Sequence, residues 1–184
     1  MPSNPRGRKT KHVQNRQNRE VVPSQRPEKK YDFYAQVGYL LRRVFQRHTA
    51  IFQRMSIDPQ LTAIQFVVLC VIAENSPCFL TTISRSAALD PATTRGVVER
   101  LSKRNLITIT PDKVDRRRVA AELKEKGRRL VEEMIPCSLR ITEATMFGLN
   151  AAERVALQFL LTKIIESGDP DEIEDASLFD FKRR

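Results

Sequence analysis

Two short stretches of the sequence bring several basic side chains close together, Asp90–Asn105 and Asp115–Arg118. Arginine and lysine side chains pair with phosphate oxygens and with base edges of nucleic acids, and small polar side chains such as threonine assist them. A carboxylate beside an arginine fixes the direction of a flexible cation. The residues of these stretches that we expect to contact DNA are Thr93, Arg95, Arg100, Lys103, Asp115, Arg116, Arg117 and Arg118.

The overall charge points the same way. The chain has 184 residues, with 32 Lys and Arg against 22 Asp and Glu and a net charge of +10. A polyanionic partner is expected for such a chain, and nucleic acid is favoured over an anionic membrane surface. With 41% hydrophobic residues, the chain can bury one sizeable core, so a single domain with appended tails is expected.

Other chemistries find little support in the residue inventory. The chain has three cysteines, Cys70, Cys78 and Cys137, which form no CxxC pair, and only two histidines, His12 and His48. Neither a metal site nor a cofactor is therefore expected. There is no Gly-rich phosphate loop and no nucleophile–base pair, so an enzyme is not expected. Thiols kept reduced in the cytosol are the simplest interpretation, and redox sensing by a cysteine is an alternative.

Nothing in the sequence indicates secretion or a membrane span. The longest apolar runs, such as Phe66–Ala73, are far too short to cross a bilayer. The basic N-terminus is not followed by the apolar segment of a signal peptide. We therefore expect a cytoplasmic protein that associates with the nucleoid.

The stretch Asp90–Asn105 carries its own start and stop signals for a helix. Asp90 is a favoured N-cap residue, and Pro91 is tolerated in a first turn. Asn105 accepts the left-handed conformation that ends a helix. A surface helix with a solvated charged face is the alternative interpretation. The apolar stripe expected to pack inward consists of Thr94, Val97, Val98 and Leu101.

The neighbouring segments favour a DNA-reading helix. A short helix capped by Thr81 or Thr82 and running to about Leu89 precedes it, which gives a helix-turn-helix pattern. Cys78–Leu80 forms at most a short strand. The pattern continues with strands over Leu106–Thr110 and Arg118–Leu123.

A charged loop, Pro111–Arg117, joins these two strands and predicts a wing. The loop is either solvated or a DNA contact, and its place directly after a helix-turn-helix favours a phosphate or minor-groove contact. We expect Asp115 to orient Arg117 for this contact.

Longer helices are predicted on both sides of this unit. They are an amphipathic helix from Tyr31 to Met55, a buried helix over Ala63–Glu74 capped by Thr62, a helix over Glu125–Gly148 kinked at Pro136, and a last helix over Ala151–Ser167 capped by Asn150 with Glu153. The last helix has more apolar surface than one neighbour would cover. Residues 1–30 are expected to form a disordered basic arm, which either reaches nucleic acid or only aids solubility, and residues 168–184 an acidic tail.

The order of these parts resembles the multiple antibiotic resistance regulator (MarR) family of winged-helix transcription factors. The resemblance rests on Leu61–Leu69, on Asp90–Arg95, and on Asp115–Arg117 followed by Leu123 and Glu125–Gly127. It implies a mainly α fold with a small β wing, in which residues 31–167 form one MarR-type domain. Residues 61–123 would be the winged helix-turn-helix, and residues 31–56 and 125–167 the dimerisation helices. Lys124, Asn105 and Gly96 depart from the family pattern.

The resemblance also implies a homodimeric repressor that reads a pseudo-palindromic operator in double-stranded DNA. It further implies release of DNA by a small-molecule effector, an aromatic acid or its conjugate. Side chains on the first two helices are candidates for binding it, although aromatic residues at helical spacing are more often core. The candidates are Arg43, Phe45, His48, Phe52 and Phe66.

One further alternative from a different class stays open. A winged helix can bind a protein instead of DNA. Such a module would not need Arg95, Arg100 and Lys103 on the same side as Arg116–Arg118.

Overall fold

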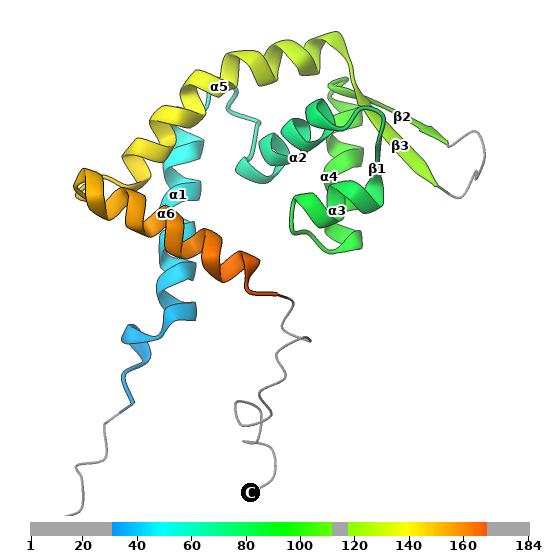
Figure 1. Cartoon of the computed structure of the whole chain (residues 1–184). Coiled ribbons are helices and arrows are strands. Elements are labelled where there is room, and N and C mark those ends of the chain that lie inside the picture. The colour runs from blue at the N-terminus through cyan, green and yellow to red at the C-terminus, as the bar shows by residue number, and fades with distance from the viewer. Residues whose placement is uncertain (1–30, 112–117, 169–184) are drawn as a thin grey trace, which may run out of the picture.

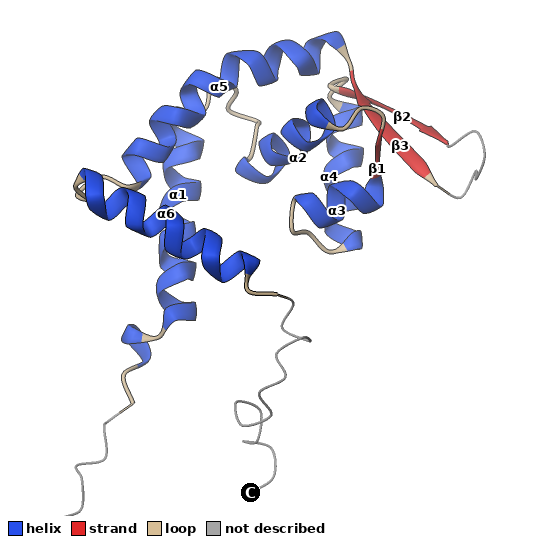
Figure 2. Cartoon of the chain, viewed as in Figure 1, coloured by secondary structure: helices blue, strands red, loops and turns tan. Residues whose placement is uncertain are grey.

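The computed structural model describes residues 31–111 and 118–168. It confirms a mainly α fold with a small sheet (Figures 1 and 2). The predicted arm, the wing tip with Asp115, Arg116 and Arg117, and the tail from residue 169 lie outside the described residues. The helices are α1 Val37–Met55, α2 Ala63–Glu74, α3 Leu80–Ser86, α4 Pro91–Lys103, α5 Glu125–Thr145 and α6 Ala151–Glu166, with a 3-10 turn, η1, at Phe33–Ala35.

The two ends of the molecule have different roles in the fold. Helices α2, α3 and α4 and the sheet form one end, and α1, α6 and the second half of α5 form the other (Figure 1). One hydrophobic core runs through the helix-turn-helix end and is closed by side chains from α1 and α5. Its fully buried members include Leu61, Leu69, Ile72, Ile83, Leu101, Leu106, Met134 and Ile141.

The predicted cap of α2, Thr62, and the predicted capping pair of α6, Asn150 with Glu153, are confirmed. At the start of α2 the Gln65 N–H donates to Thr62 Oγ1 at 3.2 Å, and the Thr62 N–H donates to Gln65 Oε1 at 3.1 Å. At the start of α6 the Glu153 N–H donates to Asn150 Oδ1 at 3.0 Å, and the Asn150 N–H donates to Glu153 Oε2 at 2.8 Å. Each reciprocal pair satisfies two backbone donors that the helix itself cannot satisfy.

The first helix starts later than predicted. The segment from Tyr31 was expected to be helical throughout, but α1 begins at Val37 after the separate turn η1. Asp32 caps that turn, since its carboxylate accepts the Tyr34 N–H at 2.9 Å. Gln36 then adopts an extended conformation with ψ 134°, which separates the turn from α1.

The third helix also differs from its prediction. Neither Thr81 nor Thr82 is the cap, because α3 begins at Leu80 with Phe79 at the N-cap position, and it ends at Ser86 rather than near Leu89. The cause is tertiary: strand β1, Cys78–Phe79, pairs with β3, so the chain turns into the helix directly after the strand. Ala88 has a φ of 51° and forms the tight turn before α4.

The three strands form an antiparallel sheet with the order β1-β3-β2. Strand β2, Ile107–Pro111, pairs along its whole length with β3, Val119–Leu123. The predicted hairpin is therefore confirmed, with each strand starting one residue later than expected. Phe79 of β1 pairs with Ala120 of β3, which fixes the short strand against the base of the wing.

The entry to α5 is packed tightly against the exit from α4. The Leu106 carbonyl accepts the Lys124 N–H at 3.0 Å, and the Leu106 N–H donates to the Leu101 carbonyl at 3.1 Å. A Cβ atom at Gly127 would overlap with the Leu106 carbonyl oxygen. Only glycine therefore allows α5 to pass this close to the start of β2.

Helix α5 contains Pro136 and ends at Thr145, three residues before the predicted Gly148. Proline lacks the N–H that would bond to the preceding turn, and its ring crowds that turn. Figure 1 shows that α5 bends part-way along its length, in agreement with the predicted kink.

Candidate nucleic-acid interface

The start of α4 is fixed by Asp90 and Thr93. The Thr93 N–H donates to Asp90 Oδ1 at 2.9 Å, and the Thr93 hydroxyl donates to Asp90 Oδ2 at 2.6 Å. The hydroxyl bond, followed by the backbone bond, lowers the pKa of the Asp90 carboxyl below its usual range. Because the hydroxyl proton of Thr93 is already donated, this side chain presents an oxygen acceptor to an outside donor.

The inner face of α4 is the predicted one. Thr94, Val97, Val98 and Leu101 are buried, and the Thr94 hydroxyl donates to the Asp90 carbonyl at 2.9 Å, which satisfies it within the core. This packing fixes the rotation of the helix about its axis, so the opposite face is presented to solvent. That face carries Arg95, Arg100 and Lys103, all exposed.

Gly96 influences how Arg100 lies on this face. A Cβ built at Gly96 would be 3.3 Å from Nη1 of Arg100, so the guanidinium group lies over the glycine. A Cβ at position 96 would require this group to shift by a few tenths of an ångström. The absence of a side chain at this departure from the family pattern leaves room for the Arg100 guanidinium group.

At the base of the wing, Arg118 lies over an aromatic ring. The Arg118 Cζ atom is 4.1 Å from the centroid of the Phe79 ring. Sequence reasoning identified Arg118 but missed Phe79, because the two residues meet only through the pairing of β1 with β3. The only hint of Phe79 in the sequence was an aromatic residue, a type common in strands, in the short segment before α3.

Arg95 and Arg118 line the same groove. It lies between α3, α4 and the sheet, has a volume of about 730 Å³, and has a mainly apolar floor that includes Leu80, Val98 and Ile109. The structure thus brings one predicted contact from the helix and one from the wing together. Of the other predicted contacts that the structure describes, Thr93, Arg100 and Lys103 do not line this groove.

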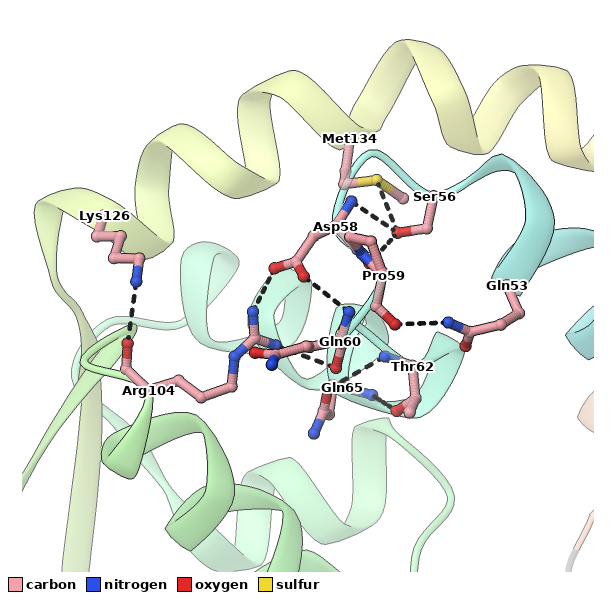
Figure 3. A network of polar contacts seen from close by, with 10 residues as sticks. All are labelled: Gln53, Ser56, Asp58, Pro59, Gln60, Thr62, Gln65, Arg104, Lys126 and Met134. Atoms are coloured by element: carbon pink, nitrogen blue, oxygen red, sulfur yellow. Dashed lines mark hydrogen bonds and ion pairs between the residues drawn. The ribbon is translucent and has the colours of Figure 1, made fainter.

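The other end of α4 is held by an ion pair that the sequence did not reveal. Arg104, the C-cap residue, pairs with Asp58 in the loop between α1 and α2, and it donates to the Gln60 carbonyl at 3.2 Å (Figure 3). Lys126 of α5 donates to the Arg104 carbonyl at 3.4 Å. The partners are 46 residues apart in the chain, so no local pattern could have indicated this contact.

The same loop is tied to the long helices. The Gln53 side-chain amide of α1 donates to the Pro59 carbonyl at 2.7 Å (Figure 3). The Ser56 hydroxyl lies 2.9 Å from the Asp58 carbonyl and 3.7 Å from the sulfur of Met134 on α5. The position of α4 is therefore set by contacts that reach both α1 and α5.

The five effector candidates do not form one cluster. Phe52 and Phe66 are 3% and 9% exposed with ring centroids 6.0 Å apart, so they are a core pair. Phe45 and Arg43 are exposed, and Arg43 donates to the Tyr39 hydroxyl at 3.2 Å. His48 is half-buried, with Nδ1 3.0 Å from the Thr145 hydroxyl of α5. Of these candidates, His48 is the polar one at the contact between α1 and α5.

The surroundings of the cysteines bear on the alternative hypothesis that a cysteine senses oxidants. Burial raises the pKa of Cys78, and burial followed by the charge of Glu74 raises the pKa of Cys70. A raised pKa lowers the thiolate fraction on which oxidation depends. Cys137 is buried and accepts a contact from Arg140 Nη2 at 3.4 Å.

Across residues 31–111 and 118–168, no helix has the length and apolar character needed to span a membrane. In the same ranges, no three His, Cys, Asp or Glu side chains gather as a potential metal site.

Comparison with known proteins gives consistent matches. The sequence signature of the MarR family matches residues 61–119. The transcriptional repressor NicR of Pseudomonas putida is 50% identical over 139 residues, which span 76% of this chain and 88% of NicR. A solved structure of BpsR from Bordetella bronchiseptica, whose DNA binding is regulated by 6-hydroxynicotinic acid, is 49% identical, with a TM-score of 0.70 over 75% of this chain and 99% of BpsR.

A more distant structure shares the fold. The transcriptional regulator PcaV of Streptomyces coelicolor, solved in complex with its natural ligand, is 24% identical and has a TM-score of 0.69 over 76% of this chain and 98% of PcaV.

Proposed function

Because this chain belongs to the MarR family of winged-helix transcriptional regulators, we propose that it is a repressor that binds a pseudo-palindromic operator as a homodimer and is released by a small aromatic acid. The repressor role is supported by its 50% identity to NicR. The choice of effector class is supported by its 49% identity to BpsR, which responds to 6-hydroxynicotinic acid.

The observation that carries the proposal is the exposed face of α4. Asp90 and the buried stripe of α4 fix the helix so that Arg95, Arg100 and Lys103 point to solvent. In this proposal α4 enters the major groove, and Arg95 and Arg100 contact base edges or flanking phosphates. Thr93 accepts a hydrogen bond from a base amino group. Arg118 and Arg116 contact the DNA backbone. Arg117, oriented by Asp115, inserts into or beside the minor groove.

Binding to duplexes from the promoter region beside the gene for this chain tests the proposal. We expect nanomolar affinity that falls steeply with salt, because each lysine or arginine on a phosphate releases counterions. Arg95→Ala and Arg100→Ala should each weaken binding at least tenfold, while Lys163→Ala on α6 removes the same charge without effect. Salt-insensitive or absent binding by the wild-type protein would reject DNA recognition.

The homodimer is supported by the apolar surface left open on the helices outside the winged helix-turn-helix. Large apolar side chains on α1 and α6 are between 45% and 79% exposed in the single chain, far more than a stable surface usually tolerates. A two-fold dimer would cover both faces and place two α4 helices about 34 Å apart. The exposed apolar residues are Val37, Leu40, Leu41, Val44 and Phe45 of α1 and Val155, Phe159, Leu160, Ile164 and Ile165 of α6.

Light scattering with size-exclusion chromatography tests the dimer directly. The wild-type chain should run at twice its mass of 21.2 kDa. Leu160→Glu should shift it toward a monomer and abolish operator binding, whereas Glu166→Gln at the end of the same helix should leave both unchanged.

Effector binding is proposed around His48, with Arg43, Phe45, Phe52 and Phe66 as further candidates. The half-buried imidazole joins α1 to α5, so a ligand that replaces its contact with Thr145 would alter the helix pair that supports the DNA-binding end. Calorimetry with 6-hydroxynicotinic acid, nicotinic acid and benzoic acid tests this. His48→Ala should lose binding of the preferred acid, and equal heats from both proteins would remove His48 from the site.

A further inference from the structure

The guanidinium group of Arg118 lies over the face of an aromatic ring. Its Cζ atom lies 4.1 Å above the centroid of Phe79, well inside the roughly 6 Å within which a cation is attracted to an aromatic face. We infer that Phe79 is a positioning residue for DNA binding, whose ring holds Arg118 ready to contact a backbone phosphate. The inference rests on the proposed function, and it adds a residue that touches no DNA.

Strand pairing explains why the two side chains meet. Phe79 is paired with Ala120 across the β1–β3 ladder, and Arg118 lies two residues before Ala120. Arg118 directly precedes β3, Val119–Leu123, so it lies next to the ladder that holds Phe79. From there its long side chain reaches the face of the Phe79 ring. The register of a two-residue strand therefore decides where this cation lies.

Stacking on a ring suits a phosphate contact better than an ion pair would. A guanidinium group has five N–H donors that lie in its plane, so a ring against its face leaves them free. A carboxylate partner would occupy donors and cancel the charge. Holding the side chain in place before binding also reduces the conformational entropy that is lost when it contacts DNA.

The position of the stacked pair agrees with this role. Phe79 and Arg118 both line the groove between α3, α4 and the sheet, which Arg95 of α4 also lines. Arg85 and Glu99 are the other charged residues along this groove. A DNA backbone that follows α4 toward the wing would thus meet Arg95 and Arg118 in succession.

A double-mutant cycle on DNA binding by the full-length dimer tests the inference. Phe79→Leu keeps an apolar side chain but removes the aromatic face, and it should weaken binding about threefold per lobe, or about tenfold for a dimer. The slope of log affinity against log salt should not change, because Arg118 still reaches the phosphate. Arg118→Ala should lower that slope by about one per lobe. Phe79→Leu should have no further effect in the Arg118→Ala background.

Conservative variants separate positioning from simple structural support. Phe79→Tyr should restore wild-type affinity. Arg118→Lys keeps the charge and the salt slope but stacks poorly, so Phe79→Leu should add little to it. The loss caused by Phe79→Leu should be equal on operator and unrelated duplexes, since a phosphate contact carries no sequence information. Arg85→Ala, which alters another cation of the same groove, should combine additively with Phe79→Leu.

The outcomes that overturn the inference are distinct from failure of the proposed function. Additive losses for Phe79→Leu and Arg118→Ala, or a salt slope altered by Phe79→Leu, would show that Phe79 does not act through Arg118. If Arg118→Ala left a tight, salt-sensitive complex unchanged, the positioning role would fail while DNA recognition stood. Wild-type protein that bound no duplex would defeat the proposed function itself.

Discussion

The ammonium group of Lys124 lies 2.5 Å from the side-chain oxygen of Asn105. Both residues depart from the MarR pattern, in which a capping threonine and a glycine are usual at these positions. Lys124 makes no side-chain cap to α5, and Asn105 has a φ of 60°, in the left-handed region. The two departures are therefore in direct contact, with the lysine bonded to the turn that asparagine rather than glycine forms.

The stability of the turn at Asn105 should be lowered more by alanine than by glycine at this position. Asn105→Ala should lower the free energy of unfolding by about 1–2 kcal/mol, because alanine is strained in the left-handed region. Asn105→Gly relieves that strain and loses only an exposed hydrogen bond, so it should cost less than about 1 kcal/mol. Urea unfolding at fixed protein concentration measures both. Lys124→Ala should then have no effect in the Asn105→Gly background, and a remaining loss would disprove the coupling.

Two glycine-to-alanine changes in helices should have opposite signs. Gly127→Ala should destabilise the protein by about 3 kcal/mol, since its Cβ would overlap with the Leu106 carbonyl. Gly38→Ala near the start of α1 has no atom within 4 Å of the new Cβ and should stabilise by about 0.5 kcal/mol through helix propensity. Thermal unfolding of the two variants side by side is the measurement. Equal effects would mean that the close approach at Leu106 does not exist.

The ion pair that holds the end of α4 should matter more than an exposed one. The Arg104 and Asp58 side chains are each 20% exposed, whereas Arg129 and Glu125 on α5 are 70% and 66% exposed. Arg104→Met should lower the free energy of unfolding by about 2 kcal/mol, a value between those for surface and buried ion pairs. Arg129→Met should cost less than about 0.5 kcal/mol. The comparison is made by chemical denaturation, and a larger loss at Arg129 would contradict the role of the Asp58 pair.

The pKa of Asp90, the N-cap residue of α4, should depend on the Thr93 hydroxyl. The Thr93 hydroxyl is the main cause of the lowered pKa of Asp90, so Thr93→Val should raise that pKa toward its ordinary value of 3.8. A carboxyl whose pKa is lowered by folding stabilises the fold fully above its ordinary pKa, and the contribution disappears as the pH falls through the lowered value. NMR titration of the Asp90 carboxyl carbon measures the shift. Thr93→Ser keeps the hydroxyl and should keep the low pKa, and an unchanged pKa in Thr93→Val would refute the assignment.

Local signals in the sequence were sufficient for most of the fold. Asp90, Thr62 and Asn150 are capping residues whose partners lie within three positions, so the starts of α4, α2 and α6 were predictable. The wing followed from two β-branched or small-residue runs around a charged loop. The start of α3 was not predictable, because Thr81 and Thr82 are plausible caps until the pairing of Cys78 and Phe79 with β3 is known.

The candidate interface was likewise predictable from the sequence only where it depends on local patterns. The exposed cations of α4 follow from its helical period, since Arg95 and Arg100 fall outside the stripe that includes Val97 and Leu101. Contacts between distant segments do not follow from any local pattern. The pair of Asp58 with Arg104 and the stacking of Arg118 on Phe79 depend on tertiary packing and on strand register, so only the structure reveals them.

The junction at Leu106 has a mechanical consequence. The last turn of α4, strand β2 and the first turn of α5 meet at this one buried residue, with Gly127 in contact and no room for sliding. We therefore expect these three elements to move together as one rigid arm. In a homodimer, a change in the spacing of the two reading helices would have to be absorbed farther along α5. Pro136 interrupts the backbone hydrogen bonds there, so the flexural stiffness of α5 around it would govern how far the two arms can swing apart.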